Sequence, residues 1–152
     1  SLLGSADLKH LLAQADQQIR QELPGVRVAF YLRQSDGCEL YSFEDDETFA
    51  CEQEGPQEYL TSELVAEICK SNRICTLGKR SSLALRENIP GLAEFSIATL
   101  PLSALGRSLG FTLLWCRSPL AVSEEEIRRI EPVMCGLSQA IRGTRVPLAS
   151  EE

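Results

Sequence analysis

The sequence predicts an α+β fold, in which helices cover a central, mostly antiparallel sheet. Two strand-turn-strand patterns occur along the chain, and consecutive hairpins place their strands antiparallel. Helical patterns stand at both ends of the chain and between the two hairpins. The chain has 152 residues, of which 43% are hydrophobic. This is enough material for one domain with a buried core.

The first elements predicted are a helix and a β-hairpin. Apolar residues recur at helical spacing over 6–22, and a Pro-Gly pair ends this helix. Two segments rich in β-forming residues follow, over 26–34 and 38–43, and the turn between them contains an Asp-Gly pair. Such a turn between two such segments is typical of a hairpin.

The middle of the chain combines loops with two short elements. Residues 44–58 carry seven acidic groups and no basic one, and we expect a loop there with a short strand at 49–51. Apolar residues share one helical face over 59–71, and a strand is expected over 74–79. Residues 80–93 are expected to be irregular, because they end in a Pro-Gly turn signal.

A second hairpin is predicted in the C-terminal half. Its strands are expected over 94–102 and 108–117, joined by the segment "SALGR". Gly110 lies inside the second strand, where a glycine permits the close approach of another backbone. Alternation places residues 95, 97, 99 and 101 on one face of the first strand, but it does not say which face lines a pocket.

The last helix begins with a capping-box pattern, formed by Ser123 and Glu126. Pro132 lies inside this helix and is expected to bend or split it, while Gly143 fits its end. Apolar residues of the two terminal helices form a heptad-like seam, which is a candidate helix-helix or dimer contact. The seam consists of Leu8, Leu12, Ile19, Ile127, Ile130, Met134, Leu137 and Ile141.

Composition and charge exclude several function classes. The net charge is −7, and the acidic residues 44–58 account for all of it, so no basic excess is left to bind nucleic acid. No apolar run approaches the roughly 20 residues that cross a bilayer, so no membrane insertion is expected. The six cysteines include no Cys-x-x-Cys pair, and His10 is the only histidine. We therefore expect no metal site and a reducing, cytoplasmic location.

Residues 95–142 resemble the second half of a GAF domain. In that family a strand ends in Pro-Leu, here Pro101-Leu102, and a short turn, here ending at Gly106, leads to a strand with a glycine before its apolar run, here Gly110. A serine-capped, glutamate-rich helix follows, here from Ser123. The segment "SELVAEICKSNRICTL" is similar to the family's middle helix and short strand.

This resemblance implies a GAF-like, PAS-related fold, with the N-terminal and C-terminal helices packed on one face of the sheet. It implies one domain over 6–143, with 1–5 as an expression remnant or linker and 144–152 as a tail or linker. The implied role is non-catalytic. Such a domain senses or regulates within a larger, bacterial-type signalling protein, binds a small molecule or forms a homodimer through its terminal helices, and controls an output domain.

Two other functions stay open, and the sequence identifies no cofactor. Cys69 and Cys75 flank a segment with Lys70 and Arg73, and positive neighbours favour the reactive thiolate. This pair suggests a thiol-based redox sensor, or an enzyme like the methionine sulfoxide reductases of the GAF family. The other alternative is a ligand-free dimerisation module.

The cyclic-nucleotide motif of the GAF family, of the type Asn-Lys-Phe-Asp-Glu, is missing from this sequence. Residues 70–86 carry five basic groups and no acidic one, which suggests an anionic ligand if this stretch lines the pocket. Ligand pockets are mostly apolar, so the pocket candidates are mainly aromatic and aliphatic residues. These candidates are Phe43, Phe49, Leu77, Phe95, Ile97, Thr99 and Trp115.

Overall fold

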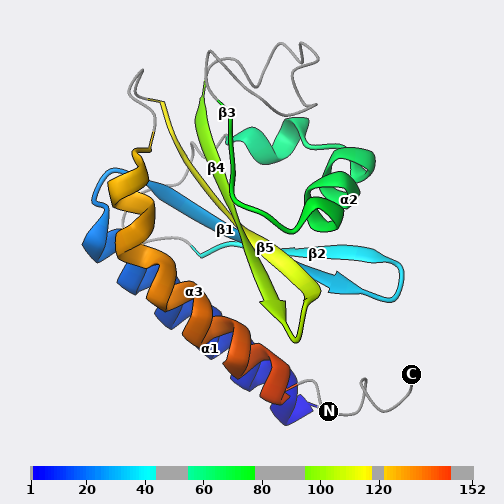
Figure 1. The fold of residues 1–152 in the computed structure, drawn as a ribbon. Coiled ribbons are helices and arrows are strands. Elements are labelled where there is room, and N and C mark those ends of the chain that lie inside the picture. Colours follow the sequence, from blue (N-terminus) through cyan, green and yellow to red (C-terminus); the bar gives the residue numbers. More distant parts are fainter. Residues whose placement is uncertain (1, 44–54, 78–94, 118–121, 145–152) are drawn as a thin grey trace.

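A computed structural model describes residues 2–43, 55–77, 95–117 and 122–144 of the chain. Its centre is one antiparallel sheet, which confirms the predicted α+β class (Figure 1). The order across the sheet is β2-β1-β5-β4-β3. The strands are β1 (Arg27–Gln34), β2 (Gly37–Tyr41), β3 (Cys75–Leu77), β4 (Ser96–Ala104) and β5 (Arg107–Cys116).

Helices cover both faces of the sheet. Helix α1 (Leu2–Glu22) and helix α3 (Glu124–Thr144) lie side by side on one face, as the family resemblance implied. Helix α2 (Ser62–Ser71) and the 3-10 helix η2 (Pro56–Tyr59) lie on the other face (Figure 1). The first turn of α1 and the last turn of α3 are at the same end of the helix pair.

The core has two layers, one on each face of the sheet. The larger layer packs α1 and α3 against the sheet, with Leu12, Ile130 and Leu114 fully buried in it. The smaller layer packs α2 against the sheet and contains Ile68 and Phe111. Alternation along the strands produces this division, because neighbouring residues of a strand point to opposite faces.

The β4–β5 turn is tighter than expected, since both strands extend further than the sequence predicted. Only Leu105 and Gly106 connect them, with φ angles of 54° and 76°. Two consecutive positive φ angles define the type I′ turn, whose twist matches that of the flanking strands.

Strand β5 contains a β-bulge close to this turn. Leu102 is opposite Gly110, but Ser103 is opposite Ser108, so Leu109 is an extra residue in β5. Gly110 has a φ of 138°, and a Cβ atom there would overlap the carbonyl oxygen of Tyr31 and lie 2.9 Å from the Leu32 Cα atom. The predicted role of this glycine, close backbone approach, is confirmed.

Helix α3 starts at the predicted cap. The backbone N–H of Ser123 donates to Glu126 Oε1 at 2.9 Å, and the N–H of Glu126 donates to Ser123 Oγ at 3.1 Å. The predicted split at Pro132 is wrong, because α3 is one helix from Glu124 to Thr144. Pro132 is exposed, so its ring faces solvent, and the buried residues on the opposite face of α3 hold the helix together across it.

Some expectations lie outside the described residues. These are residues 44–54 of the acidic segment, with its short strand at 49–51, and the irregular segment 80–93; residues 56–58 of the acidic segment belong to the 3-10 helix η2. The predicted elements around them are observed with shifted bounds. The middle helix begins at Ser62 rather than at residue 59. Strand β3 is described over Cys75–Leu77, and residues 78–79 of the predicted strand lie outside the described residues.

Candidate functional site

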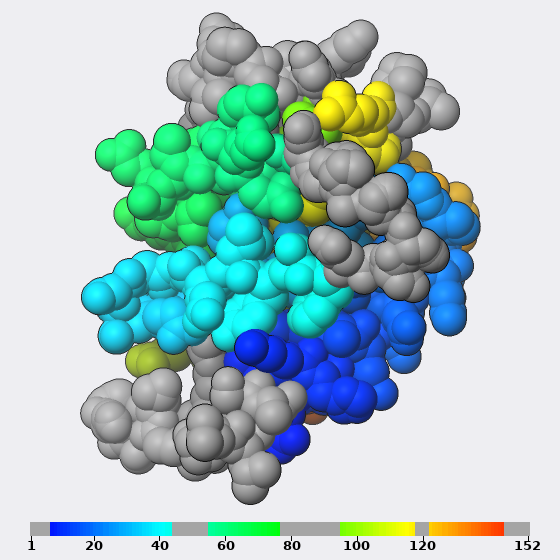
Figure 2. Space-filling view, turned by 180° about the vertical axis from the view of Figure 1, so that it is seen from behind, coloured from blue at the N-terminus to red at the C-terminus, as the bar shows by residue number. Residues whose placement is uncertain are grey.

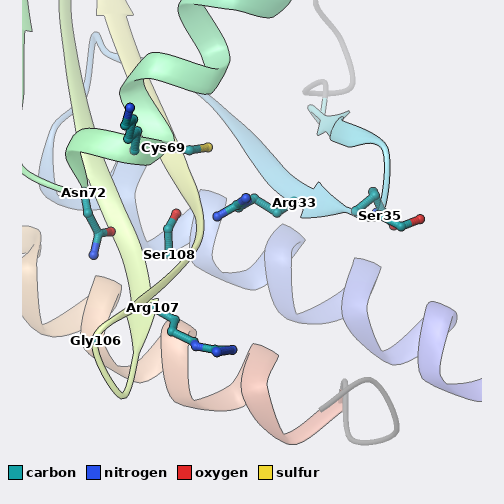
Figure 3. Close-up of a pocket in the computed structure, with 9 residues that line it drawn as sticks. Arg33, Ser35, Cys69, Asn72, Gly106, Arg107 and Ser108 are labelled. Carbon is teal, nitrogen blue, oxygen red and sulfur yellow. The ribbon is translucent and has the colours of Figure 1, made fainter. Parts of the chain in front are cut away.

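An open groove of about 750 Å³ lies where three segments of the chain meet. The end of β1, the last turn of α2 and the β4–β5 turn form its walls (Figure 3). Each wall brings one basic side chain, namely Arg33, Lys70 and Arg107, respectively. The local sequence explains this arrangement, because two tight hairpins and one helix end expose polar residues at the same end of the molecule.

The electrostatics of the groove favour an anion. Its described lining includes three cationic side chains and no acidic one. The C-terminal end of α2 also faces it, and a helix C-terminus carries about half a negative charge. Three full positive charges outweigh that dipole end. The groove therefore differs in sign from the chain as a whole, whose net charge is −7.

Asn72 caps α2 at the wall of the groove. It has the left-handed conformation, with φ 51° and ψ 39°, and its N–H donates to the carbonyl oxygen of Ile68 at 3.1 Å. Its side-chain Oδ1 atom is buried and has no hydrogen-bond partner. A buried amide oxygen without a donor is costly, which makes it a candidate contact for a hydrogen-bond donor on a bound molecule.

Two thiols meet beside this groove. The Sγ atoms of Cys38 and Cys69 lie 3.7 Å apart. Burial, and next the neighbouring Cys38, raise the pKa of the Cys69 thiol, and they outweigh the lowering effect of Arg33 and Ser108. The side chains of Cys69, Ser108 and Arg33 converge from α2, β5 and β1 (Figure 3). Cys69 is therefore a protonated thiol near neutral pH.

The two cysteines that the sequence suggested as a pair each contact other residues. Cys75 Sγ lies 3.8 Å from Ser71 Oγ and 3.5 Å from the carbonyl oxygen of Arg73, at the start of β3. Cys38, which sequence reasoning missed, takes the place beside Cys69. No local signal could have found it, because the contact depends on how α2 packs over the sheet.

Only some of the pocket candidates come together. Phe95, Ile97 and Trp115 belong to the smaller core layer under α2, and Thr99 is buried in the neighbouring strand position with no hydrogen-bond partner for its Oγ1 atom. Gly55 packs against the Trp115 ring, since a Cβ at Gly55 would lie 2.7 Å from Trp115 Cζ2. Other described residues therefore surround these side chains, which are buried in the core rather than exposed in a pocket.

The remaining pocket candidates lie elsewhere. Phe43 packs with the helix-side core, where its ring centroid is 6.5 Å from that of Phe30, so the sheet separates it from Phe95 and Trp115. The backbone of Leu77 pairs with Ile97 at the edge of the sheet. Phe49 lies outside the described residues.

The apolar seam of the terminal helices is part of the core. All eight seam residues are buried between α1, α3 and the sheet of one chain, and four of them have no exposed surface, namely Leu12, Ile19, Ile130 and Ile141. In the described part of the chain, no group of three metal-ligating side chains occurs. None of its helices is both long and apolar enough to span a bilayer.

Comparisons with known proteins place the fold. No family model matches the sequence, and no curated protein matches it. A GAF domain/HD domain protein from Geobacter sulfurreducens has a similar structure, with a TM-score of 0.70 and 13% identity over 96% of this chain and 99% of that one. The GAF domain of a two-component sensor histidine kinase from Bacillus halodurans also has a similar structure. Its TM-score is 0.64 and its identity 12%, over 93% of this chain and 96% of that one.

A catalytic protein also shares the fold. The type II free methionine-R-sulfoxide reductase from Thermoplasma acidophilum gives a TM-score of 0.63 and 13% identity, over 93% of this chain and 96% of that chain. The similarity in each case extends over nearly the whole of both chains. It agrees with the element order and with the terminal helices packed on one face. The resemblance seen in residues 95–142 is therefore confirmed for the fold, and this chain is a GAF-like α+β domain.

Proposed function

We propose that this chain is a non-catalytic, cytoplasmic sensory or regulatory domain of a larger signalling protein, and that it binds a small anionic molecule in the groove beside α2. The observation that carries this proposal is the groove itself, with one basic side chain on each of its three walls. A volume of about 750 Å³ falls within the range of roughly 300–1,000 Å³ that is usual for small-molecule sites.

The groove has a short physical connection to the last helix. Ser108 on the groove wall is opposite Ser103 in the hairpin, and the N–H of Ser103 donates to Ser138 Oγ of α3 at 3.2 Å. A ligand that moves the β4–β5 turn would therefore pull on the helix that leads out of the domain. Such coupling requires that the ligand bind one arrangement of α3 more tightly than another.

A contact between two copies of the domain would use other residues than the seam. The seam is buried within one chain, so we place a homodimer contact on the outer faces of α1 and α3. Arg128 and Glu131 are exposed on such a face of α3. A dimer there would transmit helix movements between subunits without opening the core.

Titration of the 15N-labelled chain with inorganic pyrophosphate tests the binding proposal, with glucose as the uncharged control. We expect saturable shifts of the amide signals of Asn72, Gly106 and Ser108. Removing one of three charges in R107Q should weaken binding by up to about fivefold, the effect of an exposed charge pair. The control variant R128Q removes an exposed charge on α3 and should bind as the wild type does. Equal affinity of R107Q and R128Q would contradict the proposal.

A thiol-dependent reductase is the second candidate. The contact between Cys38 and Cys69 favours it, and so does the fold shared with the Thermoplasma enzyme. Turnover of free methionine-R-sulfoxide with dithiothreitol as reductant is the test. The reductase candidate requires turnover that disappears in C69S and persists in C135S, whose thiol is exposed on α3. Absence of turnover in the wild type would eliminate the reductase and leave the anion site standing.

A further inference from the structure

The Cys38–Cys69 contact lies between strand β2 and helix α2, which share no backbone hydrogen bond. Cys38 lies on β2, the edge strand of the described sheet, whose backbone pairs there with β1 alone, and Cys69 lies in the last turn of α2. The two elements are neighbours on the surface seen in Figure 2, where β2 is cyan and α2 is green. No backbone hydrogen bond of the sheet connects them. Their sulfur atoms, 31 residues apart in sequence, approach to 3.7 Å.

The surroundings of these two thiols suit oxidation. Cys38 is half-buried and Cys69 is buried, so a small oxidant reaches Cys38 first. Arg33 is directly opposite Cys38 in the β1–β2 ladder, and cross-strand neighbours place their side chains on the same face. Its guanidinium also points toward Cys69 (Figure 3). Arg33 thus faces both thiols, and its charge opposes the burial that raises the pKa of Cys69.

We propose that Cys38 and Cys69 form a reversible disulfide within one chain, and that this oxidation site fastens strand β2 to helix α2. A disulfide has an S–S distance of about 2.05 Å, so the sulfur atoms need to approach by roughly 1.7 Å from their present separation. The edge position of β2 allows this movement, because among the described strands a shift of β2 affects only its ladder with β1. The site does not depend on an anion in the groove.

The chemistry balances with a peroxide as oxidant. The thiolate of Cys38 attacks one peroxide oxygen, the O–O bond breaks, and the departing hydroxide takes a proton to become water. Cys38 is then a sulfenic acid. The sulfur of Cys69 attacks the Cys38 sulfur, the S–O bond breaks, and the second hydroxide leaves as water with the Cys69 proton. Two thiols have lost two electrons, and hydrogen peroxide has been reduced to two water molecules.

Mass spectrometry of the full chain tests the proposal. The reduced protein is treated with hydrogen peroxide, blocked with iodoacetamide in urea, and digested with trypsin and Glu-C together. Cleavage after Lys, Arg and Glu places the six cysteines on six separate peptides. We expect the peptides of Cys38 and Cys69 to be joined, with free thiols falling from six to four per chain. Dithiothreitol should restore all six.

Three variants make the result specific. C38S should keep its remaining five thiols under the oxidant dose that closes the wild-type pair. C135S, which removes an exposed thiol on α3, should lose two thiols as the wild type does. C69S should form no disulfide and should leave Cys38 as a sulfenic acid, because the thiol that attacks it is missing. C38S alone is sufficient where the buried Cys69 position does not tolerate serine.

Several outcomes would overturn the proposal. A disulfide that joins Cys69 to Cys75, or either member of the pair to any other cysteine, would show that the observed contact does not direct oxidation. Cross-links between two chains would do the same. So would oxidation of Cys135 while Cys38 and Cys69 remain thiols.

Discussion

Replacing Gly110 with alanine should disrupt the pairing of the two central strands. The new Cβ would overlap the Tyr31 carbonyl oxygen, so β1 and β5 have to separate beside the stacked rings of Tyr31 and Phe111, whose centroids are 4.8 Å apart. A φ of 138° is also strained for alanine, at about 1–3 kcal/mol. Losing the partner of a buried carbonyl adds about 1–3 kcal/mol. We expect G110A to lower the free energy of unfolding by about 4 kcal/mol.

Two other glycines provide matched controls for urea unfolding followed by circular dichroism. Gly106 also has a positive φ, but a Cβ there meets no atom within 4 Å, so G106A should cost only the conformational strain of about 1–2 kcal/mol. Gly136 lies in α3 with open space around it, and G136A should stabilise the chain by about 0.5–1 kcal/mol. A G110A protein no less stable than G106A would refute the reasoning about close backbone approach.

Three further predictions concern the core, α3 and alkaline pH. P132A should raise the free energy of unfolding by about 1–3 kcal/mol, because it restores a helix hydrogen bond, and unchanged urea midpoints would contradict this. I130K places a charge at a position with no exposed surface, so circular dichroism should show unfolding; a folded variant with altered gel-filtration size would instead make the seam an interface between chains. Burial raises the pKa of Tyr31 to about 12, and the nearby Cys38 adds to this. The unfolded tyrosine ionises near pH 10 while the folded one stays neutral, so stability should fall between pH 10 and 12, by at most about 2–3 kcal/mol. Urea midpoints of Y31F should fall less over that window; an equal fall would exclude Tyr31.

Most of the fold could be predicted because its signals are local. Alternating apolar residues, an Asp-Gly turn and a capping box each act over a few neighbouring positions. The errors arose where tertiary packing outweighed a local rule. Pro132 weakens a helix, yet the buried residues of α3 on the opposite face keep it continuous. The β4–β5 turn also shortened, because strand pairing extended to the last residues able to make it.

The candidate site was largely beyond prediction because its parts are distant in sequence. The groove combines three short segments, near positions 33, 70 and 107, and none of these segments has a recognisable binding motif by itself. The basic stretch 70–86 indicated an anion, and Lys70 does line the groove, but Arg33 and Arg107 come from the two hairpins. Alternation showed that Phe95 and Ile97 share a face. It gave no means of knowing that Phe43 lies across the sheet.

The bulge at Leu109 explains why the groove and its connection to α3 occur at the same place. Without the extra residue, Ser103 would be opposite residue 109, and Ser108 would be opposite Ala104. The bulge shifts the strand by one position, so Ser108 on the groove wall is opposite the residue whose N–H donates to Ser138. Gly110 meanwhile holds β5 against β1, which fixes the distance between the β4–β5 turn and the end of β1. The one glycine that the sequence marked as a packing site thus determines the geometry of a groove that the sequence could not show.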